Sequence, residues 1–288
     1  MSFKKIIVPV IGAGGDAVAL ATAFAAARLF SGHVEALFVR PDPRETAPFG
    51  GMPVSAEVVQ QIIQNAEELA TAGANAARAY LDAAAKAAGA ERVAHPVPAK
   101  GVTCSFRETH GAFAAQIAQA ARLADLIVFA PDAPRSGPDL HGAFIETLTR
   151  CARPVLLSAA APPADLVRKI AIGWDGSAAA AHALSAALPL LAAAGAVEIV
   201  CVRAPSVDTA SADDAAAYLA LHGISAATRL VAPGGQQPAV ALLNAAVDGG
   251  ASLLVAGGYG HSRLFETLFG GTTVHIAAHA TLPLFMVH

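Results

Sequence analysis

The sequence predicts an α/β chain made of two tandem doubly wound domains, each a parallel five-stranded sheet with helices on both faces. Short apolar runs alternate with alanine- and leucine-rich stretches of helical length along the chain. Continuous apolar runs are typical of strands that are buried on both faces, which indicates a parallel sheet between two helical layers. The second observation is that the whole pattern occurs twice in the same order.

Four segments of the first half resemble four of the second half: 4–12 and 168–176, 36–40 and 199–203, 124–130 and 251–257, 153–157 and 282–286. The repeat indicates a tandem duplication, with a join marked by Pro162 and Pro163. We therefore expect one domain over residues 1–160 and a second over residues 166–288. The two domains should pack against each other as a pseudo-dimer within one chain.

Each half contains five predicted strands. They cover residues 5–10, 34–39, 102–107, 125–129 and 154–158, and then 169–174, 197–202, 226–231, 252–256 and 283–287. The main difference between the halves is a helical insertion over residues 55–89. Ser55 is a suitable N-cap, Gly89 ends the helix, and apolar residues keep helical spacing between them. Its apolar face should cover its own sheet, with a partner groove as the alternative.

Composition excludes several functions. The net charge of −3 and the pI near 6.3 provide no basic field for nucleic acid or an acidic membrane surface. Cys104, Cys151 and Cys201 are far apart in the sequence, so neither a disulfide framework nor a zinc site is expected. The apolar stretch 178–202 is divided by a glycine and a glutamate, and the apolar run near the N-terminus is too short for a signal peptide. A cytoplasmic protein without a membrane segment is expected.

A glycine-rich loop follows the fourth strand of the second half. Leu253–Ala256 opens into Gly257-Gly258-Tyr259-Gly260, and nine residues separate Gly260 from Gly270, where a helix begins. Main-chain N–H groups and the positive end of a helix can hold a phosphate there, and glycine lets the backbone come close. The plainer interpretation is that these glycines only permit a tight turn.

These segments resemble the universal stress protein family in its tandem form, over nearly the full length outside residues 55–89. The spacing Gly257-x2-Gly260-x9-Gly270 is similar to the family's nucleotide motif, although Gly271 stands where the family has serine or threonine. The resemblance implies an adenine nucleotide alpha hydrolase-like fold that binds ATP, with or without Mg²⁺, in the second domain only. It also implies a stress-response regulator or interaction module with little or slow hydrolysis.

By position, the resemblance implies a nucleotide site formed from four segments of the second half. Asp175 and Val202 would line the adenosine side. A separate hypothesis is that His261, directly after Gly260, and Arg263 supply charge to the phosphate end. The full set is Trp174, Asp175, Gly176, Val202, Gly257, Gly258, Gly260, His261, Arg263, Gly270, Gly271 and Thr272. Arg203 either covers this site or is solvated at the sheet edge.

The first half departs from this pattern. Ala130 and Ala133 occupy the first two glycine positions, and Ile11 stands where the second half has Asp175. Without glycine the backbone cannot approach a phosphate as closely. We therefore expect a degenerate site that serves as a structural partner.

Two further functions stay open. The first is a scaffold or interaction protein that binds no nucleotide, in which Gly271 marks a site in decay. The second is an enzyme acting on a nucleotide-like substrate, whose activity would disappear in Asp175→Ala. An unidentified protein partner and a homodimer are additional expectations.

Other motifs carry less weight. Gly12-x-Gly14-x-x-Ala17 follows a strand as in dinucleotide-binding folds, but Pro9 lies in that strand and the sister half lacks the motif. His275 and His279 have the i, i+4 spacing of a metal pair, but nearby cysteines and carboxylates are missing, which favours ordinary helix histidines. The sequence has neither a G-x-S-x-G elbow nor a phosphate-loop lysine. Catalytic and metal-binding residues are therefore not expected.

Overall fold

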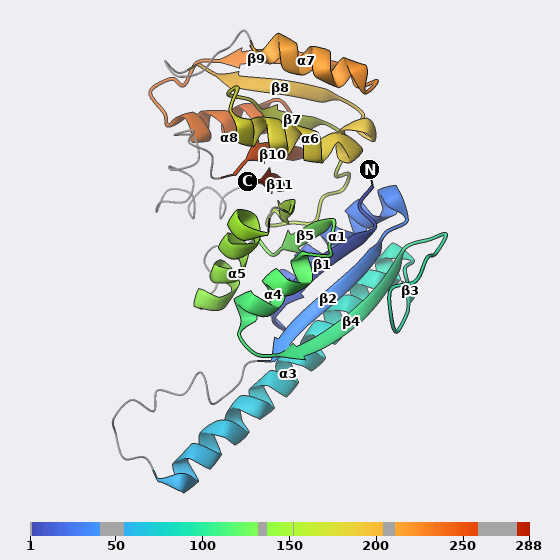
Figure 1. Cartoon of the computed structure of the whole chain (residues 1–288), viewed down its shortest axis with the longest axis vertical. Helices are drawn as coiled ribbons and strands as arrows, with labels where there is room; N and C mark the ends of the chain where they lie inside the picture. Colours follow the sequence, from blue (N-terminus) through green and yellow to red (C-terminus); the bar gives the residue numbers. More distant parts are fainter. Residues whose placement is uncertain (1, 41–54, 132–136, 152, 204–210, 259–280) are drawn as a thin grey trace.

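The computed structural model describes residues 2–40, 55–131, 137–151, 153–203, 211–258 and 281–288 (Figure 1). The first half contains β1 (Lys5–Val10), β2 (His33–Arg40), β3 (Glu91–Arg92), β4 (Thr103–His110), β5 (Leu126–Phe129) and β6 (Val155–Leu157). The second half contains β7 (Ile170–Gly173), β8 (Val197–Val202), β9 (Ala226–Val231), β10 (Leu253–Gly257) and β11 (Leu284–Val287). All ten predicted strands are present, and only the two-residue β3 was not predicted.

The strands form a single sheet in the order β3-β4-β2-β1-β5-β6-β11-β10-β7-β8-β9. If β3 is left out and each half is read from its outer strand toward the junction of the halves, the order is third, second, first, fourth and fifth strand in both. All five strands of a half are parallel. This is the doubly wound order, and it confirms the predicted fold class. The halves are therefore two copies of one topology.

The two sheets join edge to edge, which the sequence pattern did not predict. β6 and β11 pair antiparallel, with Leu284 opposite Leu157 and Met286 opposite Val155. Each of these strands is the last one of its half and would otherwise present unpaired N–H and C=O groups. Pairing removes both edges at once, and its antiparallel sense relates the halves by a pseudo-two-fold axis. The intrachain pseudo-dimer is thus one continuous sheet.

Helices cover both faces of this sheet, as predicted. One apolar core includes residues of α1 (Gly15–Phe30), α3 (Ala56–Ala88), α6 (Ala178–Ala192) and α7 (Ser211–Leu221). The other includes residues of α4 (Phe113–Ala121), α5 (Gly137–Arg150) and α8 (Pro238–Asp248). Each core contains residues of both halves; Phe3, for example, lies 6.1 Å from Phe285 between ring centroids. Among the described residues, no helix has the length and apolar character needed to cross a membrane.

The helix predicted between Ser55 and Gly89 is present as α3. Ser55 Oγ accepts a hydrogen bond from Val58 N–H, and Gly89 adopts the left-handed conformation that ends the helix (φ +66°). α3 has 33 residues, whereas α7, which connects the equivalent strands of the second half, has 11.

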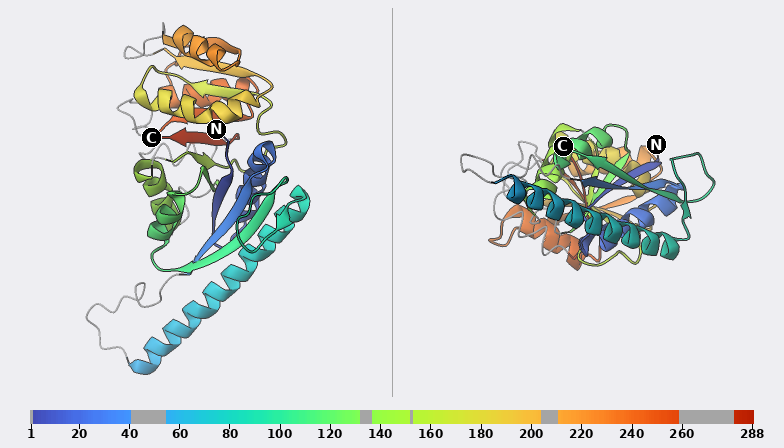
Figure 2. Two further views of the ribbon diagram at one scale, coloured as in Figure 1. Left: turned by 45° about the vertical axis from the view of Figure 1, so that its right-hand side comes forward. Right: turned by 90° about the horizontal axis from the view of Figure 1, so that it is seen from below.

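The extra length of α3 lies at its N-terminal end, which extends beyond the sheet (Figure 2, left). All buried residues of α3 lie from Ala70 onward, whereas Leu69 is 73% exposed. The insertion is therefore an extension of the crossover helix, and only its C-terminal part covers the sheet.

His33, at the start of β2, is buried with both ring nitrogens hydrogen-bonded. Nδ1 lies 2.8 Å from Thr103 Oγ1, and Nε2 lies 2.8 Å from Ser105 Oγ on the neighbouring strand β4. Burial, and secondly the charge of Lys5, lowers the pKa of His33 to about 4. The fold therefore holds the neutral ring.

We predict that the free energy of unfolding decreases as the pH falls from 6.5 toward about 4. Over this range the unfolded chain binds a proton at His33, whereas the folded chain does not. The stabilisation that depends on a neutral His33 is therefore complete above the unfolded-state pKa and is lost progressively as the pH falls below it. Urea unfolding at several pH values measures the slope. His33→Gln keeps a neutral hydrogen-bonding side chain and should give a flatter profile, whereas His95→Gln, in an exposed segment, should not. A His33→Gln profile as steep as that of the wild type would contradict this account.

Candidate functional site

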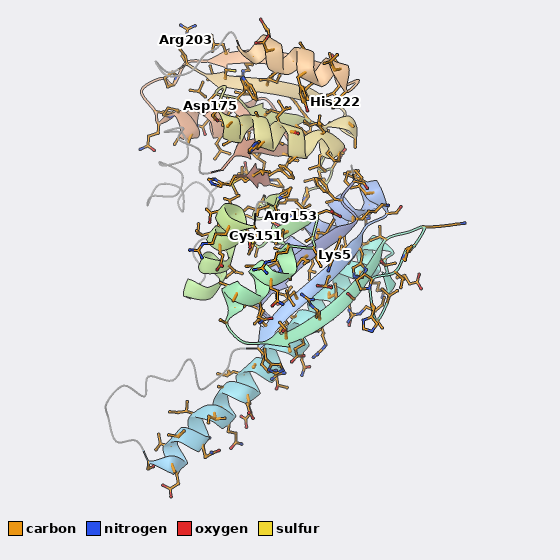
Figure 3. The ribbon with its side chains drawn as sticks, in the orientation of Figure 1. Lys5, Cys151, Arg153, Asp175, Arg203 and His222 are labelled. Atoms are coloured by element: carbon orange, nitrogen blue, oxygen red, sulfur yellow. The ribbon has the colours of Figure 1, made fainter. Side chains whose placement is uncertain are left out.

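The carboxyl-terminal ends of β7, β8 and β10 lie next to one another, on the side of the sheet where these strands end. These strands are neighbours in the order β10-β7-β8, and all three are parallel. The chain leaves β7 toward β8 in one direction and returns to β10 on the other side, so strand order reverses at β7. Ligands of doubly wound sheets bind at such a reversal. In Figure 3, Asp175 and Arg203 lie at this end of the second half, and His222 lies at the other.

The turn after β7 is held by its own side chains. Asp175 Oδ1 accepts the N–H of Ser177 at 3.0 Å, and Ser177 Oγ accepts the N–H of Ala180 at 3.1 Å, which caps α6. Gly176 between them has a φ of +74°, a conformation that favours glycine. Asp175 is half-buried and Gly176 is exposed. The turn is thus rigid and accessible.

The first half contains the same turn after β1, at a constant offset of 164 residues (175 minus 11). Gly12, at the position of Gly176, has a φ of +81°. The same offset relates the buried positions of the helices that follow: Ala19, Leu20, Ala23 and Ala27 of α1 correspond to Ala183, Leu184, Ala187 and Leu191 of α6. Asp16 of α1 therefore corresponds to Ala180 of α6.

Asp16 fills the first-half turn with a carboxylate. Its oxygens accept the N–H of Ile11 at 3.1 and 3.2 Å and the N–H of Gly12 at 2.7 Å, and the residue is 2% exposed. Two successive N–H groups in a turn of this kind form an anion-binding concavity. In the second half, no acceptor for the N–H of Asp175 or of Gly176 lies among the described residues. The donor pair is bound by Asp16 in one half, and no described residue binds it in the other.

The arginines at the ends of β2 and β8 differ in the same way. Arg40 is held by the Glu108 carboxylate, at 2.8 Å from Nε and 2.6 Å from Nη2, and by Thr71 Oγ1 at 3.1 Å. Its counterpart Arg203 is exposed and has no hydrogen-bonded or ionic side-chain partner within the described ranges. Leu230 occupies the strand position that Glu108 occupies in the first half. Among the described residues, nothing pairs with the charge of Arg203 at the candidate site.

Helix α3 packs directly against the first-half turn. A Cβ on Gly12 would lie 2.5 Å from the carbonyl oxygen of Gly73, and a Cβ on Gly73 would lie 3.4 Å from the ring of Phe38. This close approach needs glycine at position 12, whereas a Cβ at position 73 would make an ordinary van der Waals contact. It also disfavours dinucleotide binding at Gly12 and agrees with the expectation of a degenerate first-half site.

Cys201 stands in the second half where the first half has Phe38, and it is buried. Burial, followed by the carboxylates of Asp175 and Asp213, raises the pKa of the Cys201 thiol to about 11. The thiol therefore stays protonated and is a poor nucleophile. Asp213, in the first turn of α7, is a charged residue near this edge that sequence reasoning missed.

The remaining described candidates are mainly packing residues. The side chain of Val202 is 3% exposed, so only its main chain can face a ligand. Trp174 is half-buried against the apolar core. A Cβ on Gly257 would lie 2.5 Å from the carbonyl carbon of Ala179, and a Cβ on Gly258 would lie 3.2 Å from Leu148 of α5. Both glycines thus have a packing role that the loop motif does not indicate.

Six candidates lie outside the described residues: Gly260, His261, Arg263, Gly270, Gly271 and Thr272. The histidine pair His275 and His279 lies there as well. Within the described ranges, no group of three or more histidine, cysteine, aspartate or glutamate side chains could hold a metal ion.

The fold defines a class of proteins: doubly wound α/β proteins with two repeated halves in one chain. The universal stress protein family model matches residues 167–288. A protein of that family from Burkholderia pseudomallei is 30% identical over a match that covers 98% of its chain and 43% of this one, with a TM-score of 0.32. The chain belongs to the universal stress protein family.

The fold also matches over the full length. A universal stress protein from Archaeoglobus fulgidus DSM 4304 has a TM-score of 0.64 at 15% identity, with 99% of this chain and 97% of that chain covered. A protein from Pseudomonas aeruginosa UCBPP-PA14, described as a universal stress protein, has a TM-score of 0.51 at 17% identity, with 99% and 93% covered. At these identities the matches show the fold alone. A comparison with curated protein sequences gave no match.

We predict that Gly257→Ala lowers the free energy of unfolding by about 1–3 kcal/mol, because the new methyl group forces the end of β10 away from the start of α6. Without nucleotide the loss reports the packing contact alone, because that contact lies within the protein. Chemical denaturation measures it. Gly142→Ala is a matched control, since a Cβ there would meet nothing within 4 Å. Equal stability of Gly257→Ala and wild type would contradict the packing role.

Proposed function

We propose that the second half binds an adenine nucleotide, ATP, at the carboxyl ends of β7, β8 and β10. The chain then acts as a cytoplasmic regulator or interaction module whose surface responds to nucleotide, with little or slow hydrolysis. The observation that carries this proposal is the difference between the two strand-end turns. Asp16 occupies the donor pair of the first half, and no described residue occupies the equivalent pair of the second half.

The described residues fit the two ends of a nucleotide. The Asp175 carboxylate is an acceptor beside two main-chain donors, and a ribose hydroxyl or the edge of adenine both donates and accepts. Arg203, which has no side-chain partner among the described residues, adds a cation for phosphate oxygens. Mg²⁺ is usually bound through one or two carboxylates and substrate phosphates, so it would come with the triphosphate. The glycine loop up to Thr272, including Gly260, His261, Arg263, Gly270 and Gly271, remains part of the proposed site.

Slow turnover follows from the residues that could stabilise a transferring phosphoryl group. The chain has no phosphate-loop lysine, and a P-loop lysine supports the charge on the β- and γ-phosphates in the NTPases that contain it. Binding therefore serves as a signal in this proposal, and the nucleotide is not consumed at a significant rate.

A scaffold that binds no nucleotide is the second candidate, and the packing of Gly257 and Gly258 favours it. Gly257 makes room for the main chain of Ala179, and a Cβ on Gly258 would crowd Leu148, whether or not a phosphate is bound. Adenine absorbance in the purified protein would support nucleotide binding. Calorimetry that shows no heat with ATP or ADP at millimolar concentration would support the scaffold.

We predict that Ala180→Asp weakens ATP binding by at least about tenfold, because it installs in the second half the carboxylate that closes the first, and a tenfold change needs only about 1.4 kcal/mol. Titration calorimetry of the purified variants measures the dissociation constant. Ala180→Asn has nearly the same shape without the charge and should have a smaller effect. Asp16→Ala, in the other half, should leave the affinity unchanged. Unchanged affinity in Ala180→Asp would exclude the 175–176 turn from the site.

A further inference from the structure

Gly258, the residue after β10, has both its main-chain N–H and its main-chain carbonyl group hydrogen-bonded. Its N–H donates to Val287 O at 2.6 Å. Its carbonyl oxygen lies 3.0 Å from Nδ1 of His288. Because Val287 belongs to β11, the start of the glycine loop is attached to the strand that joins the two halves.

The first half contacts the same residue through α5. Both Cδ atoms of Leu148 lie 3.2 Å from the position of a Cβ on Gly258, and Leu148 is fully buried. Gly258 does not have a positive φ, so its backbone conformation does not require glycine. The absence of a side chain is therefore explained by the approach of a leucine from the other half.

Leu148 is held firmly in this position. It belongs to the apolar core that also contains Phe144 and Phe129, whose rings meet edge to face with centroids 5.5 Å apart. Close-packed cores resist displacement of a side chain by even a methylene group. A main-chain ligand site depends on backbone placement to within about 0.5 Å. Leu148 thus limits how far the main chain of Gly258 can shift toward α5.

We propose that Leu148 is a positioning residue for the nucleotide site of the second half, so that the first half sets nucleotide affinity across the sheet junction. This inference rests on the proposed function, because it assigns a role toward the same site. The first half closes its own crevice with Asp16 and α3, and it acts on the second half through α5. The unit that binds nucleotide is the whole chain.

The test is a double-mutant cycle of Leu148→Ala and Gly258→Ala, with the dissociation constant for ATP measured by calorimetry on protein shown to be folded by its thermal transition. Gly258→Ala should weaken binding roughly tenfold, because the methyl group is pushed against Leu148; that change corresponds to about 1.4 kcal/mol, within the range of measured couplings. In the double variant the methyl group occupies the space that Leu148 leaves. Its affinity should return to within about threefold of wild type, well short of the sum of the single effects.

Leu140→Ala is the matched control for this cycle. Leu140 is buried on α5 in the same apolar core, eight residues earlier and therefore about 12 Å away along the helix axis. Its combination with Gly258→Ala should be additive. If Gly258→Ala does not fold, Leu148→Val in the wild-type background replaces it, with weaker ATP binding expected than in Leu140→Val.

Two outcomes separate this inference from the proposed function. If wild-type protein binds ATP and the effects of Leu148→Ala and Gly258→Ala on the dissociation constant are additive, the positioning role is wrong and nucleotide binding stands. If wild-type protein gives no heat with ATP, the proposed function fails, and the positioning role fails with it.

Discussion

The antiparallel pairing of β6 with β11 is the interaction on which the rest of the structure depends. Edge strands of a sheet are sites of unwanted association, and each half alone would present one. With Leu284 opposite Leu157, both edges are buried and each helical layer continues from one half to the next. The pseudo-two-fold relation of the halves follows from this pairing, as does the contact of α5 with the end of β10. A break at this junction would expose two apolar strands and separate the two crevices.

The two halves have the same backbone conformation at the turn after their first strand. They differ in what accepts the hydrogen bonds of its N–H groups. Gly12 and Gly176 both have positive φ values, so both turns still present two successive N–H groups at the end of the first strand. The difference lies one helical turn further on, where Asp16 in one half corresponds to Ala180 in the other. A neighbouring carboxylate provides an internal anion at a fixed distance, and it gives the first-half turn the hydrogen bonds that a bound ligand would otherwise make.

Sequence periodicity was sufficient for the strands and for α3, because a buried parallel strand and a capped helix are specified by local residues. Ser55 and Gly89 fixed both ends of the long helix correctly. The joining of the sheets could not be predicted, since β6 and β11 read as two ordinary buried strands and nothing local specifies the partner of an edge. The role of Asp16 was missed although the repeat aligns it with Ala180. A carboxylate four residues after the turn glycine Gly12 could have indicated that the turn binds an internal anion. The packing roles of Gly257 and Gly258 depend on Ala179 and Leu148, which are distant in sequence.

An internal ligand and an external one have different thermodynamic consequences. The carboxylate of Asp16 is present at a fixed effective concentration, so its contribution to the stability of the first half is constant. A nucleotide in the second half would stabilise the folded chain by RT ln(1 + [L]/Kd), which is about 2.7 kcal/mol at one hundred times Kd. Because both halves belong to one sheet, the free energy of unfolding would then have two parts. One part would depend on the nucleotide concentration, and the other would not. The duplication can thus yield a chain in which one half, closed by its own Asp16, provides a frame for the half proposed to bind the ligand.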